Sequence, residues 1–93
     1  MKYKRDVKQP GVTRFLVDEH INLNEFRSLM TALSAELSSR VEWTSIPEAE
    51  IGEIKLSSGE IYAKLDFEYG LEIHCDGVMD HVVFQIETTL SEK

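Results

Sequence analysis

The sequence is poor in cysteine, with Cys75 alone among 93 residues. A single cysteine forms no intramolecular disulfide, and together with three histidines it leaves little material for a structural zinc site. No apolar run approaches the roughly 20 residues that a membrane-spanning helix needs, and Met1–Pro10 lacks the apolar stretch of a signal peptide. We therefore expect a cytoplasmic protein that does not contact a membrane.

Motifs for common chemistry are also missing. The chain has no G-x-S-x-G nucleophile elbow, no phosphate-binding P-loop, no dinucleotide-binding fingerprint and no Cys-x-x-Cys pair. Alternation along the segment Leu71–Cys75 places Cys75 on the buried side of a strand and His74 on the other, so the two side chains point apart. A buried thiol in an acidic setting is a poor nucleophile. We predict a protein that is not an enzyme and holds no cofactor.

Cations are scarce in the second half of the chain. From Glu42 to Glu92 two lysines stand against twelve acidic residues, a local charge of −10 in a chain whose net charge is −7. Because phosphate contacts need clustered cations, direct binding to nucleic acid is not expected. The first nine residues carry a local charge of +3, and we expect residues 1–11 to form a basic flexible tail before one domain over residues 12–93.

One helix is indicated by several independent signals. Asn22 followed by Glu25 forms a capping box, and Ile21 with Phe26 fits a hydrophobic staple. Apolar residues then recur every three or four positions and the pattern fades after Leu37. They are Leu23, Phe26, Leu29, Met30, Leu33 and Leu37. This spacing predicts an amphipathic helix whose apolar face belongs to the core.

Strands are indicated elsewhere by alternation. It predicts them at Val12–Asp18, after a Pro10-Gly11 turn, at Val41–Ser45, and as a meander over Ile51–Cys75. The segment His81–Leu90 fits a strand or a helix, and we favour the strand because the segment is rich in β-branched and aromatic residues. The predicted fold is α+β, with a single helix on one face of a largely antiparallel five- to six-stranded sheet, in the order β-α-β-β-β-β-β. In the alternative the last element is a helix.

The turns of the meander set its register. A two-residue link at Ser58-Gly59 would place Leu56 opposite Ile61, so that both apolar sets share one face. A three-residue turn at Glu68–Gly70, with its glycine in the left-handed conformation, keeps the next strand on the same face.

The same registers predict an unusual outer face. They set Asp66 opposite Glu72, and directly opposed like charges destabilise a sheet. Glu68 and Tyr69 lie at the adjacent exposed turn, and Tyr62 lies farther along the face. Tyrosine among carboxylates is typical of surfaces that dock onto cationic partners. We therefore predict a partner-binding site made of these five residues, with a plain solvated sheet face as the alternative.

A cluster of histidines and an aspartate is a weak metal candidate. A four-residue turn at Asp76–Met79 would bring His74 and His81 opposite each other with Asp76 close by. Two histidines and a carboxylate are a suitable ligand set for a divalent transition metal. Asp76-Gly77 is also ordinary turn chemistry, and we predict no metal site.

The preferred function is that of a small acidic, non-catalytic protein-binding module. Its charge and size are those of inhibitors, such as immunity-type antagonists of a basic nuclease or of a nucleic-acid-binding protein. One alternative is a homodimeric structural domain whose terminal strand pairs across the dimer. The other is a small-ligand or metal-binding domain at the His74/His81 cluster.

Overall fold

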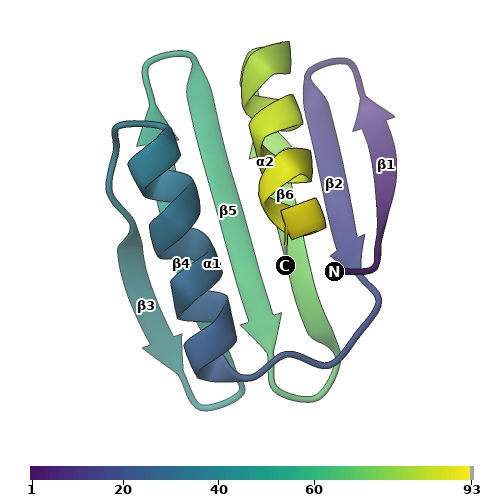
Figure 1. The fold of residues 1–93 in the computed structure, drawn as a ribbon, viewed down its shortest axis with the longest axis vertical. Coiled ribbons are helices and arrows are strands. Elements are labelled where there is room, and N and C mark those ends of the chain that lie inside the picture. Colours follow the sequence, from purple (N-terminus) through teal and green to yellow (C-terminus); the bar gives the residue numbers. More distant parts are fainter. Residues whose placement is uncertain (93) are drawn as a thin grey trace.

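The computed structural model describes residues 1–92 and contains six strands and two helices (Figure 1). The strands are β1 (Tyr3–Gln9), β2 (Val12–Val17), β3 (Glu42–Ile46), β4 (Ala49–Leu56), β5 (Gly59–Asp66) and β6 (Gly70–Asp76). The helices are α1 (Leu23–Glu36) and α2 (Asp80–Glu92). The predicted α+β class is confirmed, with a second helix in place of a last strand.

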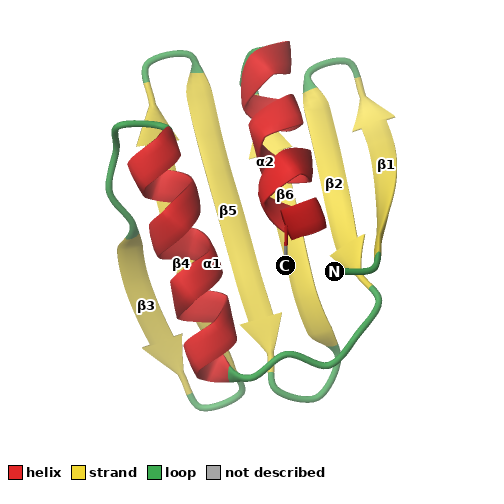
Figure 2. Cartoon of the chain, in the orientation of Figure 1, coloured by secondary structure: helices red, strands yellow, loops and turns green. Residues whose placement is uncertain are grey.

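The strands form one antiparallel sheet in the order β1-β2-β6-β5-β4-β3. Both helices lie on the same face of this sheet, α1 toward β3 and β4 and α2 over the centre, beside β2 (Figure 2). The core lies between the helices and the sheet. No element within residues 1–92 covers the other side, which we call the open face.

The capping box of α1 is confirmed. The Asn22 side-chain oxygen accepts a hydrogen bond from the backbone N–H of Glu25 at 2.8 Å, and the Glu25 carboxylate accepts one from the backbone N–H of Asn22 at 3.0 Å. The predicted apolar face is also confirmed, because Phe26, Met30 and Leu33 are buried.

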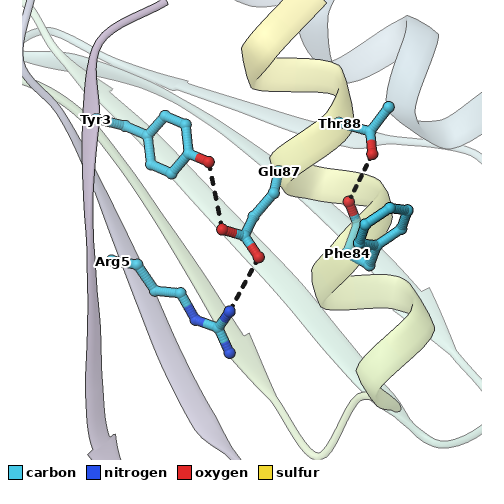
Figure 3. A network of polar contacts seen from close by, with 5 residues as sticks. All are labelled: Tyr3, Arg5, Phe84, Glu87 and Thr88. Atoms are coloured by element: carbon cyan, nitrogen blue, oxygen red, sulfur yellow. Dashed lines mark hydrogen bonds and ion pairs between the residues drawn. The ribbon is translucent and has the colours of Figure 1, made fainter.

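The N-terminal segment corrects one prediction. Tyr3–Gln9 is not a flexible tail but strand β1, which pairs with β2. The Tyr3 hydroxyl donates to Glu87 of α2 at 3.3 Å, and the Arg5 guanidinium donates to the same carboxylate at 2.9 Å (Figure 3). The Tyr3 ring also packs edge-on against Phe15, with ring centroids 5.8 Å apart. These contacts come from distant parts of the chain, so local sequence did not indicate them.

The C-terminal segment corrects another prediction. Residues 80–92 form helix α2, so the favoured strand at His81–Leu90 is wrong and the helical alternative holds. Both neighbours of β6 are already strands, β2 and β5, so the chain leaving β6 has no free position beside it. Burying a helical face over the sheet outweighs the local β propensity. The alternative of a dimer paired through a strand at His81–Leu90 therefore has no strand there to pair.

The register between β4 and β5 differs from the prediction by two residues. Leu56 lies opposite Gly59 and Ile54 opposite Ile61, so the turn is Ser57-Ser58. Gly59 is needed for space, since a Cβ there would lie 2.2 Å from the carbonyl oxygen of Asp76.

The turn between β5 and β6 is also displaced, although Gly70 has the predicted left-handed conformation with φ of 100°. Asp66 pairs with Gly70 and Leu65 with Leu71, which leaves Phe67–Tyr69 as the three-residue loop. A two-residue slip keeps every side chain that remains in the strands on its predicted face. The buried apolar residues within the predicted meander, Ile51–Cys75, are accordingly Ile54, Ile61, Ala63, Leu65, Leu71, Ile73 and Cys75.

Candidate protein-interaction surface

The five residues predicted as a partner-binding site lie in two separate places. Asp66 and Glu72 do not face each other, since Lys64 lies opposite Glu72 and Gly70 lies opposite Asp66. The two carboxylates are therefore diagonal across β5 and β6 and not directly opposed as predicted. The predicted pairing of Asp66 with Glu72 is wrong because it rested on a register displaced by two residues.

Glu72 and Tyr62 belong to a cluster on the open face. The Glu72 carboxylate lies 3.0 Å from Nε2 of His74. Tyr62 lies opposite His74 and packs edge-on against its ring, with centroids 6.2 Å apart. These side chains already have partners within the chain, which makes them poor candidates for docking.

Asp66 builds the β5–β6 turn. Its carboxylate accepts hydrogen bonds from the backbone N–H groups of Tyr69 and Glu68, both at 2.9 Å, and these bonds hold the pKa of Asp66 below its usual range. An aspartate that bonds to the backbone two residues on is a common turn device. It closes the turn one residue earlier than predicted and places Phe67 in the loop.

Two aromatic side chains project from this turn. Tyr69 is 84% exposed, as predicted from the sequence, and Phe67 is 53% exposed. Phe67 was missed because the predicted register kept it in a strand. The turn-forming Asp66, directly before Phe67, was the feature in the sequence that pointed to the true position of Phe67.

A groove of about 540 Å³ separates this turn from the segment that connects β2 to α1. Val17, Ile21 and Leu65 give it a buried apolar lining, and its rim includes Asp18, Glu19, His20, Glu68 and Tyr69. The β3–β4 turn adjoins the groove, because the N–H of Phe67 donates to the carbonyl of Glu48 at 3.0 Å. All three segments meet at one end of the sheet (Figure 1).

We call this region the acidic end and define it by Asp18, Glu19, Glu48, Asp66, Phe67, Glu68 and Tyr69. None of its five carboxylates makes an ion pair with any side chain that the structure describes. The segments that form it contain no lysine or arginine, although Lys2 lies beside Asp18, whose N–H donates to the Lys2 carbonyl at 2.8 Å. Negative charge is thus concentrated beside two exposed aromatic rings.

The histidine cluster is not assembled. His81 lies in the first turn of α2, so the predicted hairpin that would set it opposite His74 does not form. Asp76 ends β6. Within residues 1–92, no three histidine, cysteine, aspartate or glutamate side chains are grouped to hold a metal ion.

Cys75 is fully buried in β6, as alternation predicted. Desolvation raises the pKa of its thiol to about 12, against the opposing effect of the positive charge of Arg5. The thiol is therefore neutral over the ordinary pH range, which suits a core residue.

Comparison with known proteins identifies no relative, since no family model, curated protein or solved structure matches the chain. No helix within residues 1–92 is long and apolar enough to cross a membrane.

Proposed function

We propose that this protein is a non-catalytic binding module whose acidic end docks onto a basic protein partner. The observation that supports this most is the exposure of Tyr69 and Phe67 beside carboxylates that have no ion-pair partner among the side chains the structure describes. Large exposed aromatic side chains anchor interfaces, and unpaired charge of one sign attracts a partner of the other.

The groove supplies the shape for such a contact. A basic side chain of the partner would lay its aliphatic stem along the apolar lining near Leu65 and hold its charged head at Asp18 or Glu68. The hydrogen bonds to Asp66 keep the turn in place before binding, so little ordering would be needed on docking.

The finer form of the proposal is an inhibitor, such as an immunity-type antagonist of a nuclease or of another nucleic-acid-binding protein. A protein that binds phosphate groups presents clustered cations, and an acidic surface that covers them competes with nucleic acid. The net charge of −7 and the 10.7 kDa mass suit this role. Of the five residues first predicted, this proposal retains Asp66, Glu68 and Tyr69.

The test begins with affinity capture of a partner and continues with association kinetics on the purified pair. Glu68→Lys should slow association at low salt by about 3–10-fold, and added salt should reduce the difference. Tyr69→Ala should raise the dissociation constant by about fivefold or more, mainly through faster dissociation.

Two matched variants serve as controls. Glu60→Lys makes the same charge change on the open face, at the opposite end of β5, and Phe84→Ala removes a comparably exposed aromatic ring from α2. Both should bind as the wild type does. Equal effects from Glu68→Lys and Glu60→Lys would show that only net charge matters and would refute the acidic end as the site.

A further inference from the structure

Strand β3 (Glu42–Ile46) lies at an edge of the sheet. Its only neighbour among the described strands is β4, and its residues from Glu42 to Ser45 are exposed. Such an edge presents unpaired backbone N–H and C=O groups that can pair with another strand. The identity of that strand follows from the residues of β3.

The two edges of the sheet are built differently. The opposite edge, β1, carries Lys4 and Arg5 and has a bulge between Val7 and Gln9, which are features that discourage pairing with another chain. The pairing of β3 with β4 is regular over its whole length, and β3 contains no lysine, arginine or proline. Only β3 is therefore suited to receive a further strand.

The turn at Pro47-Glu48 determines which backbone groups face outward. Ile46 and Ala49 flank this two-residue turn, so they form a hydrogen-bonded pair. Alternation from there directs the backbone groups of Thr44 toward β4 and those of Trp43 and Ser45 away from it. An incoming antiparallel strand must offer its own groups at the same spacing.

A second copy of β3 meets this requirement. With a two-fold axis at Thr44, Trp43 of one copy lies opposite Ser45 of the second copy, and their outward backbone groups pair. Thr44 then faces Thr44 of the second copy on the open face, and threonine pairs of this kind stabilise antiparallel strands.

Charge also favours a second copy over a basic segment. Glu42 is the single charged residue of β3, and it already lies 3.8 Å from Lys55. In the two-fold register Glu42 lies opposite Ile46 of the second copy, so no like charges face each other. A basic segment would find no free carboxylate within the strand.

Trp43 would add apolar contact. Its indole packs edge-on against Phe26, with centroids 5.8 Å apart, and lies over Gly52, where a Cβ would approach it to 3.1 Å. Its exposed fraction is nevertheless 40%. Because β3 is the edge strand, a strand added there would cover part of the exposed ring.

We infer that two copies of this chain associate through β3, antiparallel about a two-fold axis at Thr44, into one continuous sheet. Sedimentation equilibrium of the wild type should give twice the 10.7 kDa chain mass at high protein concentration. Thr44→Lys places two lysines against each other across the axis and should raise the dissociation constant at least about tenfold. Thr31→Lys, on the exposed surface of α1, should leave it unchanged.

A disulfide between the two copies tests the proposed register independently of the Thr44→Lys variant. Thr44 and Thr44 of the second copy form a non-hydrogen-bonded pair, whose Cα atoms lie about 4.5 Å apart, within the range of a disulfide. Thr44→Cys should therefore oxidise in air to a covalent dimer, whereas Thr31→Cys should stay monomeric on a non-reducing gel.

The dependence of binding on salt concentration distinguishes this self-association from docking onto a basic partner. Each copy carries a net charge of −7, so added salt should strengthen the dimer, whereas it should weaken the proposed docking. A wild type that stays monomeric at about 1 mM would overturn the inference. The β3 edge would then be a candidate site for an extended segment of another protein. A dimer that Thr44→Lys does not weaken would overturn it as well.

Discussion

Glu50 is a charged residue buried within the described part of the chain. Its carboxylate is 2% exposed and accepts hydrogen bonds from the Arg27 guanidinium at 2.6 and 3.0 Å and from the Ser45 hydroxyl. A buried carboxylate is tolerated only when such donors replace the water it has lost. Glu50 lies between the strand and the meander that the sequence predicts, Val41–Ser45 and Ile51–Cys75, and its pairing with Arg27 of α1 was not foreseen.

The bonds to Glu50 predict how stability depends on pH. The Ser45 hydroxyl and the Arg27 guanidinium lower the pKa of Glu50 against the opposing effect of burial. The resulting stabilisation is complete above the unfolded-state pKa of about 4.3 and is lost as the pH falls through the lower folded-state pKa. Urea melts should therefore show the largest gap in stability between wild type and Glu50→Gln at pH 7, shrinking below pH about 4.3.

The exposed carboxylate Glu60 provides the control for this measurement. Glu60→Gln removes an acid from the open face, where no side chain described in the structure bonds to it. If Glu50→Gln and Glu60→Gln gave the same pH profile, the network around Glu50 would not contribute to stability.

Cys75 predicts a second measurable property. Because its thiol is fully buried and its pKa is about 12, a thiol reagent at pH 8 should label the native protein at least about tenfold more slowly than the unfolded protein. Absorbance of the released chromophore follows both reactions. Rapid labelling in native buffer would mean that β6 opens readily or that Cys75 is not in the core.

At the scale of single elements, α1 should depend strongly on its apolar face. Leu33 is 1% exposed, and Leu33→Ala should lower the free energy of unfolding by about 2–5 kcal/mol through lost burial and the cavity that remains. Thr31→Ala, on the exposed face of the same helix, should change it by less than about 0.5 kcal/mol. Chemical denaturation of both variants measures the difference, and similar midpoints would contradict the assigned helix face.

Helix α2 can be distinguished from a strand by two adjacent residues. Val83 is 7% exposed and Phe84 is 69% exposed, whereas strand alternation would bury Phe84 and expose Val83. Val83→Asp should therefore cost about 3 kcal/mol or more, because it buries an unpaired charge, and Phe84→Asp should cost less than about 0.5 kcal/mol. Thermal melts followed by circular dichroism test this order of the two variants. The reverse order would indicate that the segment forms a strand.

At the scale of the whole molecule, the two ends of the chain are tied together. Glu87 of α2 holds both Tyr3 and Arg5 of β1 (Figure 3). Partly exposed pairs of this kind contribute about 0.2–1 kcal/mol, so Glu87→Ala should raise local opening of β1 by roughly 2–5-fold. Hydrogen exchange should quicken in Tyr3–Gln9 and stay unchanged in β5, and uniform acceleration would indicate global rather than local loosening.

The distribution of charge over the molecule also follows from the fold. The basic N-terminal residues lie along the β1 edge, where Arg5 and Arg14 pair with Glu87 and Asp6. The acids of the acidic end come from three separate segments and have no such partners among residues 1–92. This separation makes one end of an otherwise mixed surface suitable for a basic partner.

The sequence by itself determined the features that depend on neighbouring residues. Asn22 and Glu25 set the start of α1, and the apolar spacing set its buried face. Alternation set the buried face of each strand of the meander, because side chains on a strand alternate whatever the register. The exposed turn at Glu68 and Tyr69 was found in the same way.

Tertiary structure alone decided the features that depend on distant residues. Gly59 lies against the carbonyl of Asp76, and the β4–β5 register is displaced by two residues from the predicted one. The β5–β6 displacement followed instead from a local signal that the prediction overlooked, the bonds of the Asp66 side chain to its own turn. Because β2 and β5 occupy both positions beside β6, the last segment could not add a strand there and forms a helix. Glu87 of that helix bonds to Arg5 and so helps to hold the N-terminal strand in place. Local propensity differs between alternatives by about 1 kcal/mol, so long-range packing, which is worth several times more, decides between them.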